Sequence, residues 1–104
     1  MTEGFRKVAR ASEIPPGEVA VVEVDGRSIA LGHTSDGRWG AIDNVCTHDG
    51  GTLGEGELDE SGVECPRHGG RFDLFTGRVL ALPPVKAVAA YETRVDGDVV
   101  EVRL

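Results

Sequence analysis

The sequence predicts an all-β fold, an antiparallel sandwich or barrel of short strands, on three observations. Glycine accounts for 15 of the 104 residues and is scattered between short apolar runs, as in chains with many turns. Asp-Gly pairs at 25–26, 36–37 and 96–97 adjoin runs rich in β-branched residues, which is a strong hairpin signal. No long segment shows the hydrophobic period of a helix. The expected architecture is therefore a compact set of hairpins.

The elements can be assigned in order along the chain. Phe5–Arg10 is a candidate first strand, and the Pro-containing segment Ala11–Glu18 predicts a turn or a short helical turn. Further strands are expected beside the Asp-Gly pairs, at Val19–Val24, Arg27–Leu31, Arg38–Ile42, Ala87–Val95 and Asp98–Leu104. In the last of these, Val100, Val102 and Leu104 alternate with charged residues, so one face should be apolar and the other wet.

Length and charge limit the classes of function. A chain of 104 residues predicts one domain, residues 1–104. The net charge of −7 disfavours binding to nucleic acid or to an anionic membrane surface. Met1–Arg10 has no apolar export region, and no stretch approaches the roughly 18 apolar residues of a membrane span. We expect a soluble, cytoplasmic protein, and nothing in the sequence demands an oligomer, so a monomer is expected.

The region Asp43–Val85 differs from the predicted hairpins around it. It contains both cysteines, two of the three histidines and the acidic run Glu55–Glu64, which predicts a solvated loop. Long loops inside compact domains are usually functional. We therefore expect residues 43–85 to form a separate functional subdomain inserted in the β scaffold.

Two short clusters in this region combine a thiol with an imidazole. They are Cys46-Thr47-His48 and Cys65-Pro66-Arg67-His68, sixteen residues separate His48 from Cys65, and each cluster precedes a Gly-Gly pair. Glycine allows the backbone to approach a bulky inorganic core and to direct N–H groups at it. Zinc is an alternative, although common zinc sites pair Cys with Cys and His with His. A single disulfide between the two cysteines is the other alternative, disfavoured in a chain without an export signal.

The pattern C-x-H followed by C-x-x-H, within the words CTHDGG and CPRHGGRFD, resembles the Rieske iron–sulfur family. The resemblance implies one [2Fe–2S] cluster with Cys46 and Cys65 on one iron and His48 and His68 on the other. It extends over nearly the whole chain, and Leu82–Val85 falls where the family has a proline-bearing loop that covers the cluster.

The resemblance also implies a low reduction potential. High-potential members have a disulfide between two further cysteines, whose positions are Gly51 and Arg67 here, and Ser and Tyr donors, whose positions are Gly70 and Phe72. Lost donors stabilise the reduced, more negative cluster less. We expect a potential near the bottom of the family range of roughly −150 to +300 mV. Histidine ligation further predicts a potential that falls at alkaline pH.

Nothing in the sequence indicates a substrate pocket or a catalytic base, so the expected role is electron transfer. The resemblance implies a ferredoxin that takes electrons from a flavin-dependent reductase and passes them to a terminal oxygenase, such as a ring-hydroxylating dioxygenase, through brief contacts at the histidine edge. The alternatives are a nitrite reductase small subunit, a protein of iron–sulfur assembly, a redox sensor and a zinc-stabilised interaction module.

The remaining conspicuous side chains have simpler interpretations. His33 is expected on the surface in a turn, and Trp39 and Tyr91 should pack at the core or its rim. Arg67 and Arg71 flank the second cluster and are either docking contacts or solvated charges.

Overall fold

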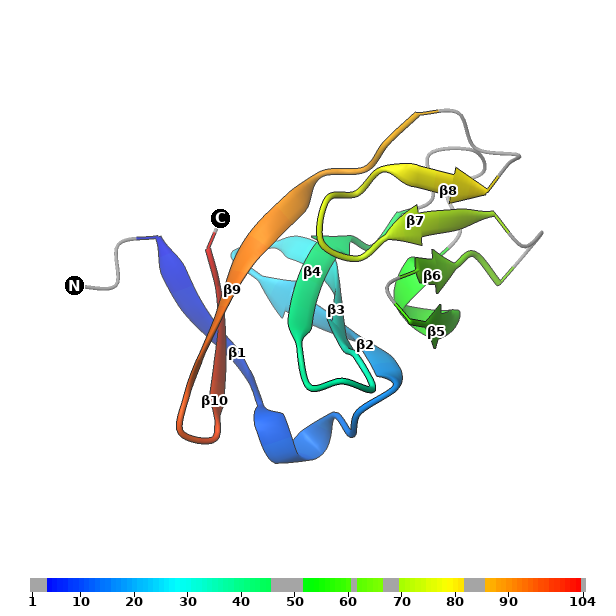
Figure 1. The fold of residues 1–104 in the computed structure, drawn as a ribbon. Coiled ribbons are helices and arrows are strands. Elements are labelled where there is room, and N and C mark those ends of the chain that lie inside the picture. The colour runs from blue at the N-terminus through cyan, green and yellow to red at the C-terminus, as the bar shows by residue number, and fades with distance from the viewer. Residues whose placement is uncertain (1–3, 46–51, 61, 67–69, 82–85, 104) are drawn as a thin grey trace.

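The computed structural model describes residues 4–45, 52–60, 62–66, 70–81 and 86–103, and it consists of two antiparallel sheets (Figure 1). The larger sheet contains, in spatial order, β1 (Phe5–Arg10), β10 (Val99–Arg103), β9 (Ala90–Asp96), β4 (Trp39–Asp43), β3 (Arg27–His33) and β2 (Glu18–Val24). The smaller sheet contains β5 (Glu57–Asp59), β6 (Gly62–Glu64), β7 (Arg71–Asp73) and β8 (Val79–Ala81). The predicted all-β class is confirmed.

Helical structure in the described residues is limited to two 3₁₀ turns, η1 (Ala11–Glu13) and η2 (Leu53–Glu55). η1 lies in the segment where the prolines predict a short helical turn. Within the described ranges no helix has the length and apolar character needed to cross a membrane.

The predicted hairpins of the larger sheet are present. β2 and β3 are joined at Asp25 and Gly26, whose φ values of 49° and 81° match a tight turn with two left-handed residues. β9 and β10 are joined across Gly97, with φ 63°. β9 begins at Ala90 rather than at the predicted Ala87. β1 and β2, the two edge strands, are in contact, so the sheet curls into a half-barrel (Figure 1).

β3 and β4 contribute to two hydrophobic cores, one on each face. Ile29, Leu31 and Ala41 point into the half-barrel, where they pack with the predicted apolar face of β10, Val100 and Val102. The opposite faces of the same strands contribute Ala30 and Ile42 to a second core, whose other members are Leu53, Val63, Cys65, Phe72, Leu74 and Val88. Burial on both faces makes this strand pair the platform on which the smaller sheet rests.

The prediction of a solvated loop at Glu55–Glu64 is wrong. Part of this run forms the β5–β6 hairpin, with Leu58 paired to Val63. Val63 is fully buried and Leu58 packs against the second core, whereas Glu57 and Asp59 are exposed. The apolar residues on one face are thus covered while the carboxylates stay in water. The acidic composition of the run hides this short alternation.

A notch of two glycines receives Leu74, which follows β7. Gly32 of β3 and Gly40 of β4 pair directly across the strands. A Cβ at Gly32 would lie 2.8 Å from a terminal methyl carbon of Leu74, and one at Gly40 would lie 2.6 Å from its Cγ and 2.8 Å from its carbonyl oxygen. Glycine at position 40 therefore allows the backbone of the smaller sheet to approach the platform, and glycine at position 32 leaves room for the end of the Leu74 side chain.

Candidate metal centre

Of the four predicted ligands, the structure describes Cys65. Cys46, His48 and His68 lie outside the described residues, as do Gly51, Arg67 and the predicted covering loop Leu82–Val85. Within the described ranges, no group of three Cys, His, Asp or Glu side chains could hold a metal ion. The complete ligand set therefore stays a prediction.

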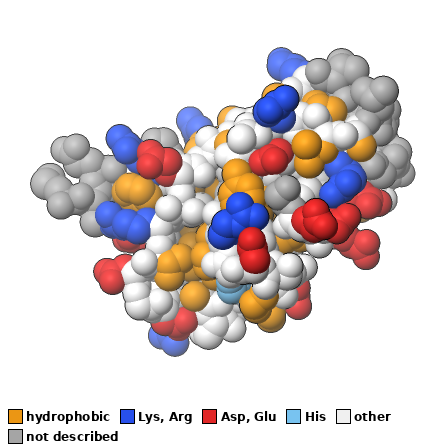
Figure 2. All heavy atoms as spheres, viewed as in Figure 1, with side chains coloured by type: hydrophobic (Ala, Val, Ile, Leu, Met, Phe, Trp, Pro, Cys, Tyr) orange, Lys and Arg blue, Asp and Glu red, His pale blue; other side chains and the backbone are white. Residues whose placement is uncertain are grey.

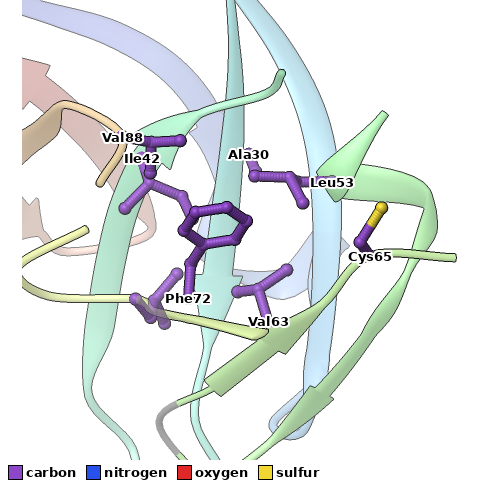
Figure 3. Close-up of a cluster of buried hydrophobic side chains, with 8 residues drawn as sticks. Ala30, Ile42, Leu53, Val63, Cys65, Phe72 and Val88 are labelled. Carbon is purple, nitrogen blue, oxygen red and sulfur yellow. The ribbon is translucent and has the colours of Figure 1, made fainter. Parts of the chain in front are cut away.

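Cys65 is fully buried and follows β6 directly. Its N–H donates to the carbonyl oxygen of Gly70 at 2.6 Å, which extends the β6–β7 pairing by one step. Figure 3 shows Cys65 at the margin of the second core, with Phe72 near the centre. A buried thiol at the edge of an apolar cluster suits a soft metal ligand that must be kept from water.

The segment that contains Cys46 and His48 is closed at its base by backbone pairing. Val45 and Thr52 form an antiparallel bridge, and the N–H of Leu53 donates to the carbonyl oxygen of Asn44 at 2.9 Å. The chain therefore leaves β4 and returns to the same place before η2 begins. This closure holds the two ends of residues 46–51 together.

The bases of the two ligand-bearing segments are neighbours. Leu53, which follows the first segment, and Cys65, which begins the second, belong to the same buried core. Gly56 lies directly on β6, where a Cβ would clash with the carbonyl oxygen of Glu64. η2 thus connects the base of one segment to the strand that ends at the other. The two predicted ligand-bearing segments therefore start from adjoining bases.

The third segment starts from the same end of the smaller sheet. Ala81, the last described residue before 82–85, pairs with Arg71 at the start of β7. Arg71 in turn follows Gly70, the hydrogen-bond partner of Cys65. The strand arrangement therefore brings the approaches to all three predicted loops to one region.

Arg71 is only partly exposed and is more than a simple solvated charge. Its guanidinium lies over Gly62, where a Cβ would be 2.5 Å from an Nη atom, and it forms an ion pair with Asp59 at 3.3 Å. Its Nε is buried and has no hydrogen-bond partner among the described residues. Arg71 packs across β5 and β6 and so contributes to the shape of the smaller sheet.

The prediction for His33 is wrong in its details. His33 ends β3 instead of lying in a turn, and it is half-buried. Its ring stacks on Trp39 with centroids 4.0 Å apart, and Nδ1 lies 2.8 Å from the carbonyl oxygen of Ile14. Cross-strand pairing with Trp39 explains this position. Trp39 and Tyr91 pack at the rim of the half-barrel core, as predicted.

An acidic groove of about 570 Å³ lies between β2 and β5. Its walls include Glu18, Glu57, Asp59 and Glu64, and Figure 2 shows acidic side chains gathered over the smaller sheet. No described cysteine or histidine lines it. β2 and β5 are edge strands, and carboxylates at such edges discourage pairing with another chain.

The described residues fit a buried iron–sulfur cluster. The soft donor Cys65 is shielded from water, and the bases of the two predicted ligand-bearing segments adjoin. The model of the Rieske [2Fe-2S] domain family matches residues 4–92. The chain belongs to this family, and the cofactor that the family implies is the predicted [2Fe–2S] cluster.

Similar proteins indicate which kind of Rieske protein this chain is. The ferredoxin component of the naphthalene 1,2-dioxygenase system of Pseudomonas aeruginosa is 38% identical over 104 residues, covering 100% of this chain and 99% of the relative. The ferredoxin of carbazole 1,9a-dioxygenase from Nocardioides aromaticivorans IC177 superposes with a TM-score of 0.89 at 38% identity, over 95% of this chain and 96% of that one.

A third similarity is to a chain in the complex of reduced oxygenase and oxidized ferredoxin of carbazole 1,9a-dioxygenase. The TM-score is 0.88 at 33% identity, over 96% of this chain and 93% of that one. Within its family the chain is thus a ferredoxin of the ring-hydroxylating dioxygenase type, which shuttles electrons to an oxygenase and is not itself a catalytic subunit.

Proposed function

We propose that the protein is a low-potential, one-electron carrier between a flavin-dependent ferredoxin reductase and the terminal oxygenase of a ring-hydroxylating dioxygenase system. Cys46 and Cys65 hold the inner iron of its cluster, and His48 and His68 hold the outer iron. Residues 1–104 form one Rieske domain, with a cluster-binding subdomain over about residues 43–85. The observation that carries the proposal is the buried thiol of Cys65 beside the closed base of the segment containing Cys46 and His48.

The ligand set explains why a single electron is transferred. When bound, the cluster accepts and releases one electron, and two thiolates with two neutral imidazoles make its oxidised form uncharged. The burial of Cys65 in an apolar core keeps water from the sulfur side. Electrons would then enter and leave through the histidine side, and no ligand position is open to a substrate.

The side chains near Cys65 support a low potential. Phe72 is fully buried in the same core as Cys65 and carries no hydroxyl. Gly70, joined to Cys65 by a backbone hydrogen bond, carries no donor side chain either. The reduced, negatively charged state is therefore stabilised by fewer hydrogen bonds than in high-potential members of the family.

The partners are expected to bind briefly and in turn. A carrier that alternates between a reductase and an oxygenase must dissociate quickly, which favours small, weak interfaces. We propose a soluble, cytoplasmic monomer. Its net charge of −7 suits basic docking patches on both partners and disfavours nucleic acid and membranes.

The ligand set is tested by replacing each histidine in turn. His48→Ser and His68→Ser should alter the visible spectrum, the EPR signal of the reduced protein and the midpoint potential. His33→Ser is the matched control, because it removes the third histidine of the chain at a site in the larger sheet. An unchanged midpoint in either His48→Ser or His68→Ser would refute the proposed ligation.

Voltammetry and stopped-flow kinetics test the carrier role. The midpoint should lie near the bottom of the family range of roughly −150 to +300 mV and should fall at alkaline pH as a bound imidazole loses its second proton. A midpoint well above zero, or one that stays flat to pH 10, would contradict the assignment. Rapid reoxidation of the reduced protein by a terminal oxygenase separates a carrier from a redox sensor.

A further inference from the structure

A buried amide side chain lies at the base of the first ligand-bearing segment, two residues before Cys46. We propose that Asn44 is a positioning residue that fixes residues 46–51 against the β scaffold and so sets the geometry of the ligands on that segment. This inference rests on the ligand set proposed above, since it assumes that Cys46 and His48 bind the cluster. Asn44 itself binds no iron in this scheme.

Asn44 connects three parts of the chain. Its Nδ2 donates to Ser28 Oγ at 2.9 Å, and its Oδ1 accepts the N–H of Gly54 at 2.6 Å. Its backbone N–H donates to the carbonyl oxygen of Ser28 at 3.2 Å, and its own carbonyl accepts the N–H of Leu53 at 2.9 Å. The start of β3, the end of β4 and the return of the segment into η2 are thus joined at one residue.

The side-chain amide of Asn44 is closely surrounded by other groups. Asn44 is only 5% exposed. At Gly54 a Cβ would lie 2.5 Å from a methyl carbon of Val21 and 2.9 Å from Asn44 Oδ1, so the hydrogen bond to the Gly54 N–H depends on the absence of a side chain there. The contact holds η2 against β2 and against Asn44, which follows β4.

Asparagine has the chemistry that this position requires. One planar amide offers a donor to Ser28 and an acceptor to Gly54 at the same time. Alanine would leave the buried Gly54 N–H without this acceptor, and such a loss is costly away from water. Gly54 lies three residues after the segment, so the loss of its bond to the Asn44 side chain would leave only backbone bonds to close the base. The ligands on it would then occupy several geometries instead of one.

The same strand pair offers a matched comparison at its other end. Thr34, which follows β3, is 1% exposed. Its Oγ1 accepts the N–H of Arg38 at 2.9 Å, and its hydroxyl also contacts Asp36. Thr34 therefore closes the β3–β4 turn as Asn44 closes the opposite end. Residues 34–38 carry no predicted ligand.

The test compares Asn44→Ala with Thr34→Ala in the cluster-containing protein. The rate of loss of the visible absorbance is measured with an excess of an iron chelator, at a temperature at which far-UV circular dichroism shows both variants folded. Asn44→Ala should lose its cluster about tenfold faster than the unmodified protein, and its reduced EPR lines should broaden because the ligand geometry is heterogeneous. Thr34→Ala should lower the unfolding temperature while keeping the rate within about twofold and the lines unchanged.

A milder variant keeps the test decisive if Asn44→Ala does not fold. Ser28→Ala removes one partner of the amide and should accelerate cluster loss by about threefold. The positioning role would be overturned if Asn44→Ala lost its cluster at the same rate as Thr34→Ala. If Asn44→Ala does not fold, the same comparison is made between Ser28→Ala and Thr34→Ala. A rate unchanged from the unmodified protein would overturn it as well. An error in the proposed ligand set would give a different result. The visible spectrum of His48→Ser would then be unaltered, whatever the rate of cluster loss in Asn44→Ala.

Discussion

The smaller sheet packs on β3 and β4 of the larger sheet, but the two sheets differ in what stabilises them. The larger sheet consists of strands of five to seven residues, several joined by short turns with left-handed residues such as Asp25 and Gly97. The smaller sheet consists of strands of three residues each. Such short strands are marginal without further packing. The smaller sheet therefore depends on its contacts with the platform.

The two sheets differ in whether they have a hydrophobic core of their own. The half-barrel has its own core between β3 and β10, with Ile29, Leu31, Val100 and Val102 fully buried. The smaller sheet has no core except the one that it shares with the platform, around Phe72 (Figure 3). The half-barrel is thus a frame that supports a sheet without a core of its own, and we expect metal binding to stabilise mainly that smaller sheet. Four predictions test this difference, from the largest expected effect to the smallest.

Removal of the cluster should affect the two sheets unequally. Binding free energy of a metal centre adds to folding free energy mainly for the residues around it. Amides of β6 and β7 should exchange about a hundredfold faster in the apoprotein, and those of β3 and β10 should change by less than about threefold. Hydrogen exchange before and after chelation measures both. A uniform acceleration in both sheets would show that they unfold as one unit.

Alanine at Gly40 and alanine at Gly32 should destabilise the protein to different extents, because the added methyl groups clash with different atoms. A methyl at Gly40 meets the carbonyl oxygen and the side chain of Leu74, whereas one at Gly32 meets only flexible side-chain atoms of Leu74 and Leu58. We expect Gly40→Ala to lower the free energy of unfolding by about 3 kcal/mol and Gly32→Ala by about 1 kcal/mol. Chemical denaturation of the cluster-containing protein measures both values.

A second substitution at Leu74 identifies the cause. Adding Leu74→Ala should compensate much of the cost of Gly32→Ala, because the clashing methyl groups are gone. It should compensate little of the cost of Gly40→Ala, because the backbone oxygen stays. Double-mutant cycles give the two coupling energies. Equal coupling at both glycines would mean that the backbone of the smaller sheet moves freely on the platform.

A hydroxyl placed in the shared core should raise the reduction potential. The ring of Phe72 is fully buried in the core that contains Cys65. In Phe72→Tyr a donor directed at a cluster sulfur would favour the more negative reduced state, and a hydrogen bond of about 1 kcal/mol corresponds to roughly 40 mV for one electron. Voltammetry measures the shift. Phe75→Tyr is the control, because Phe75 lies beyond the other end of β7 under the Arg38 guanidinium, and it should leave the potential unchanged.

The frame was predictable from the sequence because its signals are local. The Asp25-Gly26 pair and the β-branched run before it lie within a few residues of each other, and the structure has the hairpin there. The smaller sheet was not predictable, because a three-residue strand such as Glu57–Asp59 is too short to show a period. The glycine notch was hidden for another reason, since its occupant, Leu74, is distant in the sequence from Gly32 and Gly40.

In the candidate site, too, some features could be predicted from the sequence and others could not. The ligand motif is recognisable because Cys and His stand within a few residues of each other. All four ligands remain predictions, and three of them lie outside the described residues. The position of Asn44 before Cys46 carries no comparable signal. Its role depends on Ser28 and Gly54, sixteen and ten residues away, which only the folded chain brings together. Local chemistry was therefore readable in the sequence, and the residues that support it were not.

The smallest expected effect concerns Tyr91, where the frame meets the base of the first ligand-bearing segment. Its hydroxyl donates to Asp43 Oδ1 at 2.5 Å and accepts a hydrogen bond from Arg27 at 3.3 Å. Burial, and then the hydrogen bond to Asp43, raises the pKa of Tyr91, while Arg27 opposes the shift. The folded state therefore favours the neutral phenol. Its contribution to stability is complete below the unfolded pKa of about 10 and is lost as the pH rises through the folded value.

Tyr91→Phe should consequently flatten the alkaline end of the stability profile. The unmodified protein should be more stable than the variant by about 1 kcal/mol at pH 8, a value kept small because the side chain is only partly buried. The difference should shrink steadily as the pH is raised from 9 to 11, since Tyr91 is the single tyrosine of the chain. Denaturant unfolding across this range measures it. If the free energy of unfolding of the two proteins changed in parallel with pH, Tyr91 would stabilise the contact between frame and segment by packing alone. The hydrogen bond to Asp43 would then contribute nothing to stability.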